Sequence, residues 1–169
     1  MKDALARAAV NGIFALKIVL TATLAGWGSL AAGETWRFAV IGDTPYSDSQ
    51  RRELPRMLDA IAEHHVDFIV HIGDIKNGQS RCDDAVFIDR QRLFDATPQP
   101  FIFVPGDNEW TDCRRVSNGA YDPLERLDYL RTLFWLQPKS LGRKTIMLER
   151  QPGAYREHSR FRLGPVLFV

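Results

Sequence analysis

The chain has 169 residues, which is enough for one domain with a real hydrophobic core, and its composition is that of an ordinary globular protein. Its formal net charge is only +1, so it lacks the strongly basic character of nucleic-acid-binding proteins, and we expect no nucleic-acid partner. Apart from an alternation of strand-like and helix-like stretches, it contains no internal repeat and no low-complexity tract.

Residues 1–33 have the features of a targeting segment. Lys2 and Arg7 supply positive charge at the start, and Lys17 leaves about a dozen apolar residues from Ile18 to Leu30 before a short run of small residues. This order is typical of a secretory signal peptide, and the apolar stretch is short for a membrane span. We therefore expect an exported protein, periplasmic or extracellular. The alternative is an uncleaved N-terminal anchor, and only in that case do we expect the membrane to be a partner.

After this segment, short apolar runs alternate with stretches of helical periodicity. The runs are rich in β-branched and aromatic residues, which is typical of buried strands. The elements predicted in chain order are a strand Trp36–Ile41, a helix from Asp48 or Ser49 to about His65, a strand Val66–Ile72, a helix Asp83–Phe94, a strand Phe101–Val104, a helix Pro123–Phe134, and strands at Thr145–Leu148 and Phe161–Val169, the last with a bend at Gly164-Pro165. This alternation predicts an α/β fold.

Each of the first three predicted strands is followed by a Gly-Asp pair, at Gly42-Asp43, Gly73-Asp74 and Gly106-Asp107. The aspartates are 31 and 33 residues apart, a spacing that suits strand–helix–strand units. Because a parallel sheet places the carboxyl ends of its strands at one edge, we expect the three carboxylates to converge there. Such a cluster is hard to keep ionised without a cation, so the sequence predicts a metal site. The alternative is that each aspartate only closes a turn or caps a helix.

The two cysteines, Cys82 and Cys113, follow the second and third Gly-Asp pairs. Both are expected in loops at the same sheet edge, and in an oxidising compartment they are a good candidate disulfide. The bond would close a loop of about 30 residues and stabilise the fold by about 3 kcal/mol in the chain-entropy model. The alternative is two unrelated thiols, one of them reactive.

Three motifs together carry a family resemblance. They are Gly-Asp-Thr-Pro-Tyr at 42–46, Gly-Asp-Ile-Lys-Asn at 73–77 and Gly-Asp-Asn-Glu-Trp at 106–110. With them the chain resembles the calcineurin-like metallophosphoesterases, the superfamily that includes the purple acid phosphatases, over about the first half of that family's domain. The resemblance implies a β-sandwich flanked by helices. Residues 34–169 would form its N-terminal part, incomplete because the chain stops in mid-domain.

The resemblance also implies a ligand set for two divalent or trivalent metal ions, which could be Mn, Fe, Zn or Mg. Asp43 would bind the first metal, Asp74 would bridge both, and Asp107 or the neighbouring Asn108 would bind the second. Two such cations clamp a phosphate and activate a bridging water, so the implied reaction is hydrolysis of a phosphate ester by a metal-bound hydroxide.

The departures from the family pattern affect this expectation. Asn108 stands where the family has its catalytic histidine, and an amide donates a hydrogen bond but does not act as a general acid. Pro45 stands where many members have a histidine ligand, and the later histidine motifs are absent, so the ligand set is incomplete. We expect a phosphoesterase for a small phosphorylated substrate, truncated and weakly active or inactive alone. The alternatives are a non-catalytic module that binds metal or a phosphorylated ligand, and a domain that binds a small ligand without metal.

Four further residues belong to the candidate site. Glu109 is expected to orient site residues through hydrogen bonds, and His71 either does the same or packs in the core. Lys76 and Arg81, in the loop after the second pair, are expected to hold the substrate phosphate or to be solvated.

Overall fold

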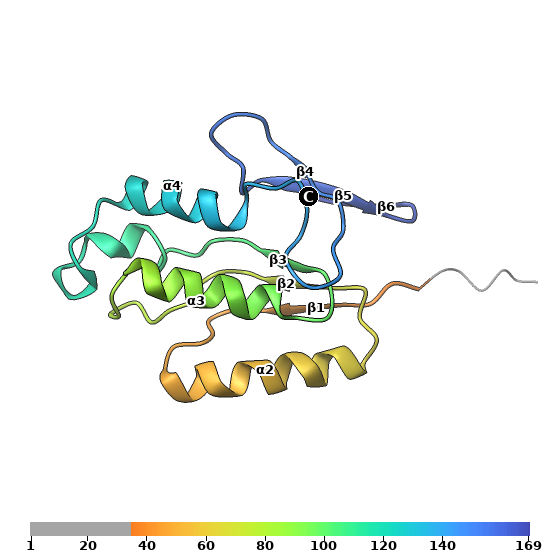
Figure 1. Cartoon of the computed structure of the whole chain (residues 1–169). Coiled ribbons are helices and arrows are strands. Elements are labelled where there is room, and N and C mark those ends of the chain that lie inside the picture. The colour runs from red at the N-terminus through yellow and green to blue at the C-terminus, as the bar shows by residue number, and fades with distance from the viewer. Residues whose placement is uncertain (1–34) are drawn as a thin grey trace, which may run out of the picture. The chain divides into compact units, whose positions relative to one another are not determined.

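The computed structural model, which describes residues 35–169, alternates strands and helices as the sequence predicts (Figure 1). The helices are α2 (Asp48–Glu63), α3 (Asp84–Asp95) and α4 (Pro123–Phe134), and the strands are β1 (Phe38–Ile41), β2 (Phe68–His71), β3 (Phe101–Phe103), β4 (Glu149–Arg150), β5 (Ser159–Leu163) and β6 (Val166–Phe168). The expected signal peptide lies outside the described residues. Among the described residues, no helix has the length and apolar character needed to cross a membrane.

The first sheet determines where the Gly-Asp pairs lie. Its strands are parallel in the order β1-β2-β3, and Ile41 pairs with His71, which pairs with Phe103. Since all three strands end at nearly the same level, the loops that follow them emerge side by side at one edge of the sheet. The mixed α/β architecture with a parallel sheet is thereby confirmed.

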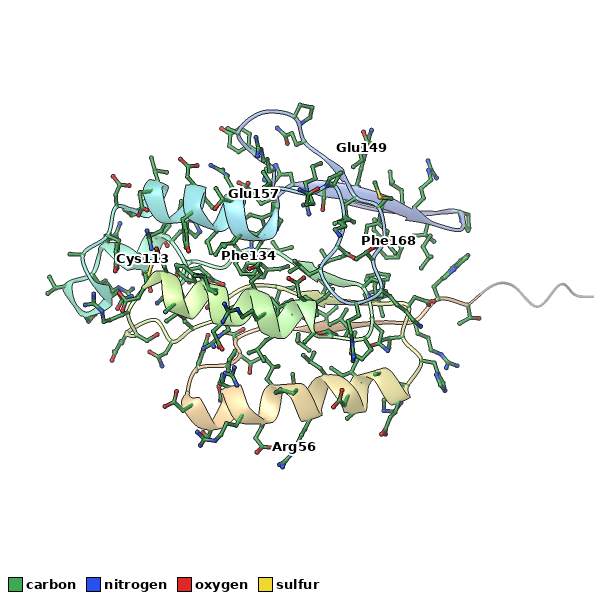
Figure 2. All side chains as sticks on the ribbon, in the orientation of Figure 1. Arg56, Cys113, Phe134, Glu149, Glu157 and Phe168 are labelled. Atoms are coloured by element: carbon green, nitrogen blue, oxygen red, sulfur yellow. A yellow bond between two sulfur atoms is a disulfide. The ribbon has the colours of Figure 1, made fainter. Side chains whose placement is uncertain are left out.

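The helices cover one face of this sheet and build the main core with it. Leu58 of α2, Phe94 of α3 and Leu130 of α4 pack in one buried cluster with the strand residues Ile69 and Phe101. Figure 2 shows the side chain of Phe134 turned into this interior from α4, and that of Arg56 projecting from α2 into solvent. Burial of this apolar surface is the main force that holds the helices on the sheet.

The helix starts also follow from the sequence. Ser47 caps α2 by accepting a hydrogen bond from the backbone N–H of Gln50, at 3.3 Å. Asp122 caps α4 through its carboxylate, and Pro123 occupies the first helical position, where no backbone donor is needed.

The second sheet is antiparallel, in the order β4-β5-β6. Its aromatic residues Phe161 and Phe168 lie edge-on against Phe68 of β2, each with ring centroids 5.1 Å apart. These rings form a second, smaller buried cluster, on the face of the first sheet opposite to the helices.

Two predictions for the last third of the chain were wrong in detail. Thr145–Leu148 is not a strand, because the pairing begins at β4 and Met147 makes only an isolated bridge with Lys139. Phe161–Val169 is not one bent strand but the greater part of the β5–β6 hairpin. The bend expected at Gly164-Pro165 is the reversal of this hairpin, and φ of Gly164 is +55°. A left-handed backbone of this kind favours glycine.

Candidate metal centre

The two aspartates that follow β1 and β2 have an uncommon backbone conformation. Asp43 has φ of +57° and Asp74 has φ of +58°, both in the left-handed region. Residues other than glycine rarely adopt this conformation, although aspartate tolerates it better than most. Backbone strain at two equivalent positions of adjacent loops is typical of functional sites.

The carboxylates of these two aspartates meet at a tyrosine. The hydroxyl of Tyr46 donates to Oδ1 of Asp43 at 2.7 Å and lies 3.3 Å from Oδ2 of Asp74. Burial raises the pKa of Tyr46, and the two carboxylates act in the same direction, so the hydroxyl keeps its proton. The loops after β1 and β2 therefore bring two carboxylates into one small space.

The third loop joins this pair. The backbone N–H of Asn108 donates to Oδ1 of Asp74 at 3.2 Å. Burial raises the pKa of Asp74, and the charges of Asp107 and Asp43 raise it further. Asp43 and Asp107 each lie within electrostatic reach of Asp74, which is the central carboxylate of the three.

Gly106 permits this close approach. A Cβ atom at this position would lie 2.1 Å from Oδ1 of Asp74 and 2.6 Å from its backbone nitrogen. Any side chain here would displace the central aspartate. The Gly-Asp pattern of the third motif is thus a packing requirement as well as a turn signal.

The residues present fit the implied metals in chemistry but not in number. Asp43, Asp74 and Asp107 offer carboxylate oxygens, which are the donors that hard cations such as Mg, Mn and Fe prefer. Within residues 35–169, however, no three histidine, cysteine, aspartate or glutamate side chains are close enough to form a complete metal-binding group. The three carboxylates thus match the donor type of the implied metals but do not complete a ligand set.

The side chain of Asn108 does not lie where a catalytic group or a metal ligand would be expected. Its side chain is buried, and its Nδ2 donates to the backbone carbonyl of Lys76 at 3.0 Å. The amide thus binds the second loop, while only the backbone of Asn108 contacts Asp74. Asp107 is exposed, so of the two neighbours it has the side chain available to a cation.

Glu109 and His71 support the loops that carry the aspartates. Glu109 is fully buried, and its Oε1 accepts from the backbone N–H of Ile75 at 3.0 Å, next to Asp74. Burial raises the pKa of Glu109 to about 7. His71 accepts from the N–H of Gly73 with Nδ1 and donates from Nε2 to the carbonyl of Thr44 at 2.8 Å. Burial lowers the pKa of His71, which favours this neutral form.

The two cations of the second loop are both engaged within the protein. Lys76 is buried, and its Nζ donates to the carbonyls of Asn77 and Ser80 at 3.0 Å and 2.9 Å, so it is neither solvated nor directed at a substrate. Arg81 is exposed and pairs with Asp83 at 2.9 Å. The loop folds over the ammonium of Lys76, and the sequence gives no sign of that.

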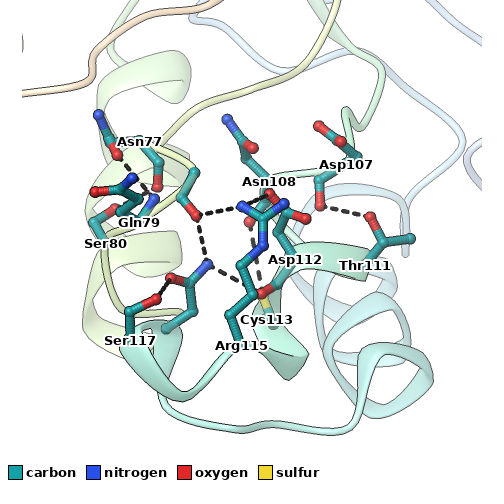
Figure 3. A network of polar contacts seen from close by, with 12 residues as sticks. Asn77, Gln79, Ser80, Asp107, Asn108, Thr111, Asp112, Cys113, Arg115 and Ser117 are labelled. Atoms are coloured by element: carbon teal, nitrogen blue, oxygen red, sulfur yellow. Dashed lines mark hydrogen bonds and ion pairs between the residues drawn. The ribbon is translucent and has the colours of Figure 1, made fainter.

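The predicted disulfide is present and ties the second loop to the third. Cys82 and Cys113 are bonded, with their Cα atoms 5.7 Å apart, and both sulfur atoms lie 3.7 Å from the carbonyl oxygen of Asn108. A polar network continues this connection (Figure 3). The carbonyl of Gly78 accepts from Arg115, and Arg115 also pairs with Asp112 at 2.5 Å. The loop that carries Asp107 is therefore held against the loop that carries Asp74.

Sequence reasoning missed Tyr46 as a functional residue. Tyr46 belongs to the first motif, but the sequence alone assigns it no role. The available signal was a hydroxyl-bearing aromatic residue three positions after an expected ligand and directly before the cap of α2. Without the structure, nothing showed that its hydroxyl reaches both Asp43 and Asp74.

One of the comparisons with known proteins identifies a family. The family model for calcineurin-like phosphoesterases matches residues 37–152, which is more than half of the chain and includes all three Gly-Asp loops. Searches of curated proteins and of solved structures gave no significant match. On the strength of the family match, the chain belongs to the calcineurin-like phosphoesterase family.

Proposed function

We propose that this protein is a metal-dependent phosphoesterase whose aspartates hold two divalent or trivalent cations at the carboxyl ends of β1, β2 and β3. The observation that carries the proposal is the meeting of the Asp43 and Asp74 carboxylates at one hydroxyl, beside the charge of Asp107. The family match supports the reaction class.

Each aspartate has a separate task in this proposal. Asp43 would hold the first cation, Asp107 would hold the second, and Asp74 would serve both. Cations held there would supply charge neutralisation of the phosphate and a more acidic water for hydrolysis. The chain's own contribution is to fix the carboxylates, since Asn108 donates its N–H to Asp74 and Glu109 anchors the next residue, Ile75.

The substrate class and the compartment are parts of the same proposal. A small phosphorylated substrate follows from the family match, because cations held by the carboxylates would attract its phosphate. Kinship with purple acid phosphatases is proposed from the motifs alone. The disulfide between Cys82 and Cys113 supports an exported, periplasmic or extracellular protein, because such bonds persist in oxidising compartments.

One observation favours a second candidate function. The side chain of Asn108, which replaces the family's histidine, is bonded to the carbonyl of Lys76 and offers no general acid. A non-catalytic module that binds metal or a phosphorylated ligand would need the aspartates but no acid. For the enzyme, the same observation leads us to expect slow turnover.

Hydrolysis of p-nitrophenyl phosphate in the presence of Mn²⁺ tests the proposal. We expect slow, Mn²⁺-dependent hydrolysis by the full chain, reduced at least about tenfold in Asp74→Asn. Asp128→Asn is the matched control, because Asp128 is an exposed aspartate on α4, and it should leave the rate unchanged.

Hydrolysis that persists after chelation of metal, or that does not depend on Asp74, would contradict the phosphoesterase. Binding of Mn²⁺ and inorganic phosphate that requires Asp74 but yields no hydrolysis would establish the binding module instead.

A further inference from the structure

The hydroxyl of Tyr46 has an unusual position, because it lies within hydrogen-bonding distance of the carboxylates of both Asp43 and Asp74. A phenol has a single proton to donate, and the shorter distance, 2.7 Å, is to Oδ1 of Asp43. Oδ2 of Asp74 lies 3.3 Å from the same oxygen. The hydroxyl therefore links the loop after β1 to the loop after β2.

Asp43 depends on this contact more than Asp74 does. Asp43 is exposed, and within the described part of the chain its carboxylate has one hydrogen-bond partner, the hydroxyl of Tyr46. Asp74 is held in addition by the backbone N–H of Asn108. An exposed carboxylate beside a second negative charge is expected to turn away from it unless a donor holds it.

The tyrosine itself is fixed by the start of α2. Its backbone N–H donates to Oε1 of Gln50 at 2.5 Å, and the N–H of Gln50 donates to Oγ of Ser47 at 3.3 Å. This reciprocal capping joins the residue before the helix to the first turn of α2. The phenol is consequently attached to a rigid element rather than to a free loop.

We infer that Tyr46 is a positioning residue, which holds the Asp43 carboxylate at Asp74 and so prepares the pair for a cation. This inference rests on the proposed function, in which both carboxylates bind metal. Tyr46 acts as a neutral hydrogen-bond donor and not as a metal ligand. When the Tyr46 hydroxyl is removed, the carboxylate of Asp43 is free to rotate. Part of the free energy of metal binding is then used to bring the Asp43 and Asp74 carboxylates together again.

The test is a calorimetric titration of the metal-free full chain with Mn²⁺, comparing the wild type with Tyr46→Phe. Phenylalanine keeps the ring and its packing and removes only the hydroxyl. We expect Mn²⁺ to bind about tenfold more weakly to this variant, with an unchanged melting temperature of the metal-free protein. Tyr121→Phe is the matched control, because it removes a similar bond, from Tyr121 to Asp83 at 2.6 Å, and should leave Mn²⁺ affinity unchanged.

The outcomes separate this inference from the function on which it rests. Unchanged or tighter Mn²⁺ binding by Tyr46→Phe, with normal binding by the wild type, overturns the role of Tyr46 alone. Tyrosinate absorption that appears when Mn²⁺ is added to the wild type also overturns it, because the oxygen would then be a ligand. Failure of the wild type to bind Mn²⁺ overturns the proposed function and this inference with it.

Discussion

Gly106 gives the sharpest test at the scale of single residues. A side chain there would meet Oδ1 of Asp74 at 2.1 Å, so we expect Gly106→Ala to push Asp74 out of place. Overpacking of this kind costs about 1–3 kcal/mol of the free energy of unfolding, and it should also weaken Mn²⁺ binding at least about tenfold. Urea unfolding and calorimetric titration measure the two effects.

Gly42 is the matched control, because it precedes Asp43 as Gly106 precedes Asp107. A Cβ at Gly42 would meet the side chain of Ile72 at 2.5 Å, and that side chain is 57% exposed and free to move. Gly42→Ala should therefore be tolerated. Equal losses of stability and of Mn²⁺ affinity in Gly106→Ala and Gly42→Ala would contradict the requirement for a close approach of the third loop to Asp74.

The residues of the site could be predicted only in part. Asp43, Asp74 and the disulfide follow from motif and spacing, because the position of a residue after a strand is a local property. The buried amine of Lys76 and the turned-in amide of Asn108 depend on how two distant loops fold onto each other. No local pattern encodes such contacts.

At the scale of elements, an ion pair connects α2 to α3. Arg51 of α2 bonds both carboxylate oxygens of Asp89 on α3, with Nη2 at 2.6 Å from Oδ1. The hydrogen bond from Arg51 lowers the pKa of Asp89, and the charge of Arg90 adds to this effect. The folded-state pKa is thus below the unfolded value, so the stabilisation is present above the unfolded pKa of about 3.9 and is lost as pH falls through the folded value.

We therefore expect Arg51→Gln to lower the free energy of unfolding at pH 7 by about 0.5 kcal/mol, a small effect because the pair is partly exposed. The difference from wild type should shrink as the pH falls from about 5 towards 2, as measured by urea unfolding across that range. Arg56→Gln is the control, since the Arg56–Glu53 pair is largely exposed. A difference that stays constant with pH would refute this account of the pair.

The predicted elements match the structure best where periodicity is strong. The helix Pro123–Phe134 has the predicted bounds, and the first three strands lie within the predicted ranges. The strand expected at Thr145–Leu148 was misplaced, because β4 has two residues and owes its position to pairing with β5. A strand of two residues is too short to show the alternation of apolar and polar side chains by which strands are predicted.

At the scale of the whole described unit, three features hold the loops after β1, β2 and β3 together. The parallel register sets the three loops at one edge, the Cys82–Cys113 bond holds the second and third loops together, and Tyr46 links the first to the second. Removal of the disulfide would cost about 3 kcal/mol of stability in the chain-entropy model. The site is thus a product of topology, cross-linking and capping together.

The most direct measurement is a crystal structure of the full chain grown with Mn²⁺, with the ion located by its anomalous scattering. We expect an anomalous peak at about 2.0–2.6 Å from carboxylate oxygens of both Asp43 and Asp74, with Asp107 facing the same space. Anomalous peaks found only elsewhere, with these three side chains turned away from one another, would contradict the proposed metal centre.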